Sequence, residues 1–152
     1  MWKTSNNLII NNTIVYNNAD GVWLGESRNC TFRNNKIAGN SYNFNVVSLS
    51  LSDLVSLDID PSNTVEGKPM YYWVNQQSKQ IPTDAGYVAV INSTEIVVKD
   101  LTLTNNSDGI LFAFTKNSII NNVTIMNGHT GIWLLHSDSN MIVGNTIQQK
   151  YY

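Results

Sequence analysis

Trp23 and Trp133 occupy matching places in two short stretches, Gly21-Val22-Trp23-Leu24 and Gly131-Ile132-Trp133-Leu134. If an extended chain buries the apolar residues on either side, each indole points outward. Exposed flat rings can stack against sugar rings, so we expect both tryptophans to contact a glycan. The aromatic run after residue 69 extends this candidate ligand-binding set by Tyr71, Tyr72 and Trp73. The alternative is that the rings seal gaps beside turns or contact a neighbouring domain.

Asp58 and Asp60 form the local pair of carboxylates that could share a catalytic task. Because they are two residues apart, they lie on one side of a strand. A polysaccharide hydrolase needs an acid together with a base or nucleophile, and a lyase needs a basic residue beside a calcium-binding acidic cluster. Grouping of this pair with Asp53 and with Lys79 or Lys99 would favour such an enzyme. We favour the other reading, in which carboxylates cap backbone at turns, and predict no catalytic residue.

A metal site would need imidazole or soft sulfur ligands that converge. His129 and His136 flank residues 131–135, and if that stretch is extended their side chains start roughly 20 Å apart. Cys30 is the one cysteine, which excludes an internal disulfide, and we expect it to be a small packed residue. The chain also offers four methionines, Met1, Met70, Met126 and Met141. We predict no metal and no other cofactor.

Five Asn-x-Ser/Thr sequences could carry glycans in a secreted protein, at Asn11, Asn29, Asn92, Asn105 and Asn122. Most of them coincide with positions where stacked asparagines would bury their amides, and a buried amide cannot be modified. We expect at most a minority to be glycosylated.

The composition argues against several kinds of partner. The 152 residues carry 9 Lys+Arg against 11 Asp+Glu, a net charge of -2 without a basic cluster. This excludes a nucleic-acid surface, because phosphate neutralisation supplies most of that affinity. No apolar run reaches the roughly 18 residues that span a bilayer, and the first residues lack the pattern of a signal peptide. Only 13% of residues are charged, so the 23 asparagines supply much of the polarity.

Self-similarity at a step of about 22 residues organises the whole sequence. Within each repeat, apolar and polar residues alternate over short stretches, which is a strand period. Asn-Asn pairs and glycines between these stretches tolerate the left-handed backbone of sharp corners. One apolar column contains Ile37, Ile59, Ile81, Leu103, Ile125 and Ile147, and a second contains Val22, Phe44, Glu66, Val88, Ile110 and Ile132. The pattern predicts an all-β parallel β-helix of about seven coils of about 22 residues.

This register places further residues. The positions between the inward-facing columns form one exterior strip, made of Trp23, Asn45, Gly67, Ala89, Leu111 and Trp133. Asp20 and Asp108 each precede a glycine in the same kind of turn, four coils apart, which is too far for the two carboxylates to cooperate. Residues 61–69 interrupt the columns, and we expect a turn there that bulges outward beneath the aromatic run. Because the register resumes at Ile81, any extra length should be small.

The runs NCTFRNNKI (29–37), SIINNVTI (118–125) and GIWL (131–134) resemble the parallel β-helix repeats of the NosD-like family, also described as carbohydrate-binding and sugar-hydrolysis domains. The stretch IDPSNTVEGKPMYYW (59–73) is similar to a segment of large surface proteins of methanogenic archaea. Together with the usual crossover rule, the resemblance implies a right-handed helix. It implies no single activity, since such repeats occur in lyases, hydrolases, epimerases, copper-maturation proteins and passive adhesins.

We therefore expect residues 1–152 to form a single parallel β-helix domain. Its first coil exposes Leu8, Ile9 and Ile10, and its last residues, 147–152, contain no capping helix, so we expect a fragment of a longer array or a unit that stacks end to end into homo-oligomers. The leading function is a non-enzymatic structural or binding module of an extracellular or cell-surface protein that contacts glycans or proteins. The alternative is a polysaccharide lyase or glycoside hydrolase whose site is incomplete in this chain.

Overall fold

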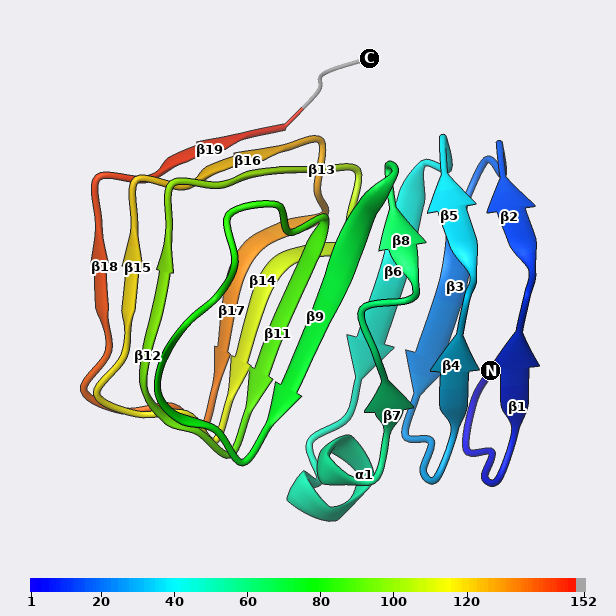
Figure 1. The fold of residues 1–152 in the computed structure, drawn as a ribbon, viewed down its shortest axis with the longest axis horizontal. Coiled ribbons are helices and arrows are strands. Elements are labelled where there is room, and N and C mark those ends of the chain that lie inside the picture. The colour runs from blue at the N-terminus through cyan, green and yellow to red at the C-terminus, as the bar shows by residue number, and fades with distance from the viewer. Residues whose placement is uncertain (150–152) are drawn as a thin grey trace.

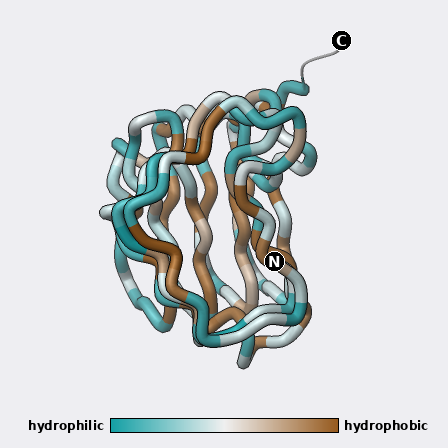
Figure 2. The backbone as a smooth tube through the Cα atoms, turned by 90° about the vertical axis from the view of Figure 1, so that its right-hand side faces the viewer, coloured by the Kyte–Doolittle hydropathy of each residue, from teal (hydrophilic) through white to brown (hydrophobic). Residues whose placement is uncertain are grey.

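The computed structural model describes residues 1–149 and is an all-β solenoid of parallel strands with about six turns, against the seven expected (Figure 1). The part of the predicted open end that comprises residues 150–152 lies outside the described residues. Viewed along the longest axis, successive coils superimpose around a common outline, with hydrophobic segments along their sides (Figure 2). In residues 1–149 no helix has the length and apolar character needed to cross a membrane.

The N-terminal half, residues 1–65, contains nearly three coils. Its strands are three-sided repeats in which two short strands precede a longer one, and its one helix interrupts the third repeat. The elements are β1 (Leu8–Ile10), β2 (Thr13–Val15), β3 (Asp20–Gly25), β4 (Thr31–Arg33), β5 (Lys36–Ala38), β6 (Tyr42–Val47), α1 (Leu51–Val55), β7 (Asp58–Ile59) and β8 (Thr64–Val65).

The C-terminal half, residues 68–149, continues the same three-sided pattern. Its elements are β9 (Lys68–Val74), β10 (Gln77–Gln80), β11 (Tyr87–Ile91), β12 (Thr94–Lys99), β13 (Thr102–Thr104), β14 (Asp108–Ala113), β15 (Ile119–Asn121), β16 (Thr124–Met126), β17 (Thr130–Leu135), β18 (Met141–Val143) and β19 (Thr146–Gln148).

Left-handed residues make the corners, as the Asn-rich composition predicts. Asparagine tolerates this backbone region better than other non-glycine residues, because its short polar side chain can hydrogen-bond locally. Ten asparagines have positive φ: Asn6, Asn11, Asn29, Asn34, Asn75, Asn92, Asn105, Asn117, Asn122 and Asn127.

Buried amides satisfy the backbone just past these corners. Asn63 is fully buried; its Oδ1 accepts from the Asn35 amide (2.8 Å) and its Nδ2 donates to the carbonyl of Phe32 (2.8 Å). Asn35, also fully buried, serves Asn12 in the same way. The ladder therefore supplies hydrogen bonds that strands cannot supply at a corner.

The predicted register is confirmed in the C-terminal half and wrong in the middle. Leu103, Ile125 and Ile147 stack as expected. In the centre, however, Ile37 pairs with Val65 rather than with Ile59.

The cause is two changes of coil length that offset each other. The turn that contains α1 separates Asn35 from its ladder partner Asn63 by 28 residues, and the next coil separates Gln76 from Ser93 by only 17. The extra length is thus not small, and it is hidden because the following coil is short. Glu66 leaves the apolar column, and Tyr71 takes its place opposite Val88.

The chain also reverses direction at residues 66–67. β8 and β9 pair antiparallel, so β9 joins the last sheet of the C-terminal half to the second sheet of the N-terminal half, in the order β17-β14-β11-β9-β8-β5-β2. Gly67 has φ +76° at this turn, in the left-handed region that favours glycine.

Two hydrophobic cores result, and one of them joins the halves. The interior of the C-terminal half holds residues such as Val88, Ile110 and Ile120. The other core combines the interior of the N-terminal half with the opposite face of β11 and β14; Phe44 meets Tyr87 there, with ring centroids 5.0 Å apart. The predicted exterior strip is therefore wrong at two positions, because Ala89 and Leu111 are buried under the N-terminal half.

Candidate binding groove

The junction of the two halves carries a polar groove of about 610 Å³. Its lining contains five asparagines but no lysine, arginine, aspartate or glutamate. The lining residues are Asn17, Asn18, Gly39, Asn40, Ser41, Tyr42, Asn105, Asn127, Gly128 and Gln149.

One corner of the coil supplies the whole lining. Asn17 follows β2 and Gly39 follows β5, whereas Asn105, Asn127 and Gln149 follow β13, β16 and β19. Because the solenoid repeats the corner that comes after each second short strand, it stacks amides there on both sides of the junction. The Asn17 Nδ2 donates to Asn40 Oδ1 (2.7 Å), and the Asn127 Nδ2 donates to Asn105 Oδ1 (3.1 Å).

Glu66 fastens the two sides of the groove together from behind. Its Oε1 accepts from the Gly39 backbone (3.0 Å), from Asn43 Nδ2 (2.8 Å) and from Asn105 Nδ2 (3.2 Å). Burial by itself raises the pKa of Glu66, but these three hydrogen bonds outweigh it and leave the pKa below its ordinary value. Glu66 is therefore an ionised anchor that leaves the groove surface to uncharged amides.

Asp20 and Asp108, expected to be too far apart to cooperate, act on the same imidazole. Burial is the main cause that raises the pKa of each, to about 6 for Asp108, while the nearby His129 lowers both. The charge of Asp20 raises the pKa of Asp108 further, whereas a hydrogen bond from Thr130 lowers it. The prediction failed because it assumed a straight stack of coils, whereas the halves lie against each other.

Backbone hydrogen bonds between the halves bring these acids together. Asn43 donates its backbone N–H to the Asn105 carbonyl, and Ser107 donates to the Phe44 carbonyl (3.3 Å). Tyr42 then lies edge-on to His129, with ring centroids 6.1 Å apart. A titratable cluster thus adjoins the Tyr42 end of the amide groove.

The predicted aromatic residues lie elsewhere and in different environments. Trp23 stacks in parallel on Trp2 (5.2 Å between centroids), so one face of its indole is covered. Trp133 is half-buried against the core that joins the halves. It belongs to the sheet of β17, whereas Trp23 belongs to the separate sheet of β3 and β6, so the two indoles do not share one ladder.

The aromatic run of β9 alternates between the two cores. Tyr71 and Trp73 are half-buried against the interior of the C-terminal half, 6.3 Å apart, and Tyr71 donates to Asp84. Tyr72 is buried, points to the other core and donates its hydroxyl to the Leu54 carbonyl (2.8 Å). Its ring therefore holds the halves together and is not accessible to a ligand.

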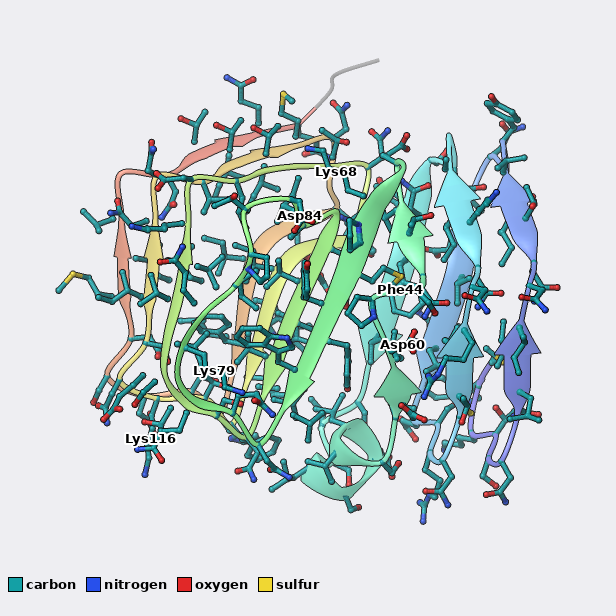
Figure 3. All side chains as sticks on the ribbon, in the orientation of Figure 1. Phe44, Asp60, Lys68, Lys79, Asp84 and Lys116 are labelled. Atoms are coloured by element: carbon teal, nitrogen blue, oxygen red, sulfur yellow. The ribbon has the colours of Figure 1, made fainter. Side chains whose placement is uncertain are left out.

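The Asp58 and Asp60 pair is neutralised by an arginine. Arg33 contacts both carboxylates, reaching Asp60 at 3.0 Å. Asp53 is buried and lies 3.4 Å from Arg28. The grouping that would favour an enzyme is not seen, since Lys79 donates to Gln76 in the C-terminal half, away from Asp60 (Figure 3).

The candidate metal ligands do not converge. Cys30 is fully buried, with its Sγ accepting from Asn7 (3.7 Å), which agrees with a packed residue. His136 packs against Phe114, whereas His129 lies beside Tyr42. Among residues 1–149 no three His, Cys, Asp or Glu side chains gather as metal ligands would. The residues present do not fit a copper centre.

The five sequon asparagines have a common placement that differs from the expectation. All five have positive φ and stand at corners. Asn11, Asn29, Asn92 and Asn122 are exposed, and Asn105 is half-buried, so the prediction that most of these amides are buried was wrong. The buried ladder asparagines are their neighbours, such as Asn106 and Asn35.

Comparison with known proteins places most of the C-terminal half in one family. Residues 64–152 match the family model described as periplasmic copper-binding protein (NosD). No curated protein and no solved structure matches the chain.

Proposed function

We propose, from the premise that this chain belongs to the NosD family, that it is a non-enzymatic structural and binding module of a secreted or cell-surface protein. The family's periplasmic description supports a place outside the cytoplasm. The likeness of residues 59–73 to a segment of archaeal surface proteins belongs to the same proposal. We assign no copper role to this chain, because its histidines, cysteine and acidic side chains do not converge on a site.

The observation that carries the binding role is the amide-lined groove. An amide offers both a donor and an acceptor, which suits the hydroxyl groups of a sugar. An acidic polysaccharide would meet no cation in this lining, and a basic partner would meet no carboxylate. We therefore propose a neutral glycan as the ligand, with Tyr42 as the aromatic contact.

A titration of neutral oligosaccharides, chosen from a glycan array, tests this proposal. Tyr42→Ala and Asn18→Ala remove groove side chains, and we expect each to weaken binding at least tenfold. Trp23→Ala and Trp133→Ala serve as matched aromatic controls outside the groove and should leave affinity within twofold. Loss of binding in the tryptophan variants alone would move the ligand to the exterior indoles, and no binding of any array glycan would refute the glycan role.

The structural role we propose is that of a rod that associates end to end. The edge strands β17, β18 and β19 leave apolar side chains uncovered at one end, with Leu134 38% and Ile147 55% exposed. Exposed strand edges of this kind are templates for pairing with another chain.

A further inference from the structure

The two ends of the rod carry the same polar pattern. β1 and β2 form one end, and β17, β18 and β19 form the opposite end (Figure 1). Near the first end, Thr4, Asn7 and Asn12 are spaced by three and five residues, and near the other end Ser137, Asn140 and Asn145 have the same spacing. Each member of one set lies 133 residues from its counterpart in the other.

These positions have a defined task between coils inside the chain. The side chain of each accepts a hydrogen bond from the backbone N–H of the equivalent residue one coil earlier. Ser137 Oγ accepts from Thr115 (3.0 Å), Asn140 Oδ1 from Ser118 (2.9 Å) and Asn145 Oδ1 from Val123 (2.8 Å). At the other end Thr4 and Asn12 donate their own N–H groups onward, to Ser27 (3.3 Å) and Asn35 (3.0 Å).

The ends are therefore complementary. Ser137, Asn140 and Asn145 have backbone N–H groups at the face where a following coil would supply acceptors, and the side chains of Thr4, Asn7 and Asn12 are acceptors of that kind.

The backbone and the apolar residues match at the same offset. Left-handed corners coincide in pairs 133 residues apart: Lys3 with His136, Asn6 with Ser139, and Asn11 with Gly144. Between the corners, Ile142 (45% exposed) corresponds to Ile9, and Ile147 corresponds to Ile14. Three layers of agreement, polar, conformational and apolar, thus specify one register.

We propose that a second copy of this chain docks its first coil onto β18 and β19, with β1 on β18 and β2 on β19. This contact uses different surfaces on the two copies, so it does not close and builds an open filament. The inference rests on the proposed end-to-end association and adds its register; it does not depend on glycan binding in the groove.

Light scattering over a concentration series, with electron microscopy, measures the association. Ile142→Lys places a charge on the docking face, while Met141→Lys is the matched control, because Met141 is already 58% exposed and alternates with Ile142 along β18. We expect Ile142→Lys to raise the concentration for half-association at least tenfold and Met141→Lys to raise it less than threefold. A parent chain that stays monomeric throughout would overturn both the association and its register.

Cysteine cross-linking tests the register itself. Thr13 and Thr146 are exposed, and the proposed docking makes them neighbours about 4.8 Å apart, within the reach of a disulfide. The double variant Thr13→Cys/Thr146→Cys should form a disulfide-linked ladder of oligomers, at least tenfold above the out-of-register control Leu8→Cys/Thr146→Cys. Equal cross-linking in the two variants would overturn the register while leaving end-to-end association standing.

Discussion

Glu66 accepts a hydrogen bond from Asn105, thirty-nine residues later, and this bond joins the turn between the halves to a corner of the C-terminal half (3.2 Å). The same oxygen holds Asn43 and the backbone of Gly39. One carboxylate therefore sets the distance between the two amide stacks that line the groove.

We predict that Glu66→Ala lowers the free energy of unfolding by about 1 to 2 kcal/mol, because it removes three hydrogen bonds to a charged acceptor. Glu66→Gln keeps an acceptor oxygen and should lose less than half as much. Since the pKa of Glu66 is lowered in the folded state, its ionised contribution is present above the ordinary pKa of 4.5 and is lost as pH falls further. Urea unfolding of both variants at pH 7 measures the effect, and equal losses would contradict the role of the charge-assisted acceptor.

Asp108 should have the opposite pH dependence. Its pKa rises from 3.8 to about 6 on folding, so the folded state holds the proton more tightly and stability falls as pH rises between these values. We predict that Asp108→Asn stabilises the protein at pH 7 by on the order of 2 kcal/mol and has little effect at pH 3.5.

The control for Asp108 is Asp138→Asn, which changes an exposed carboxylate. Urea unfolding of the three proteins at both pH values makes the comparison. A destabilising Asp108→Asn at pH 7 would mean that the ionised form is needed there, for example as a partner of His129.

The Asn ladder should be worth more than any surface amide. Asn63→Ala removes bonds to Asn35, to the Phe32 carbonyl and to the Asp60 carbonyl in a fully buried site. We expect a loss of about 2 to 4 kcal/mol in the free energy of unfolding, because buried backbone groups would remain unpaired. Asn18→Ala, at an exposed position, should cost less than 0.5 kcal/mol in the same assay.

Much of the fold could be read from the sequence because each coil repeats a local rule. Leu103, Ile125 and Ile147 share a column since every C-terminal coil has the same length, and the Asn-rich corners follow from left-handed tolerance. The middle could not be read, because the long turn with α1 and the short coil after it offset each other in the register.

The groove was hidden for a related reason. Nothing in a repeat pattern shows that the chain reverses at Gly67 and brings the N-terminal half against β11 and β14. Asn17 and Asn105 are visible in the sequence as corner residues, but their meeting across a junction depends on that reversal. The break of the apolar columns at Glu66 was the one local signal.

The central claim is that the amide stacks of the junction bind a neutral glycan, and side-chain amide resonances test it most directly. In ¹H–¹⁵N spectra, addition of a neutral oligosaccharide from the array should shift the NH₂ signals of Asn17, Asn18 and Asn127, while the buried ladder amide of Asn63 stays in place. Shifts confined to the indole signals of Trp23 and Trp133, or no shift at saturating oligosaccharide, would contradict it.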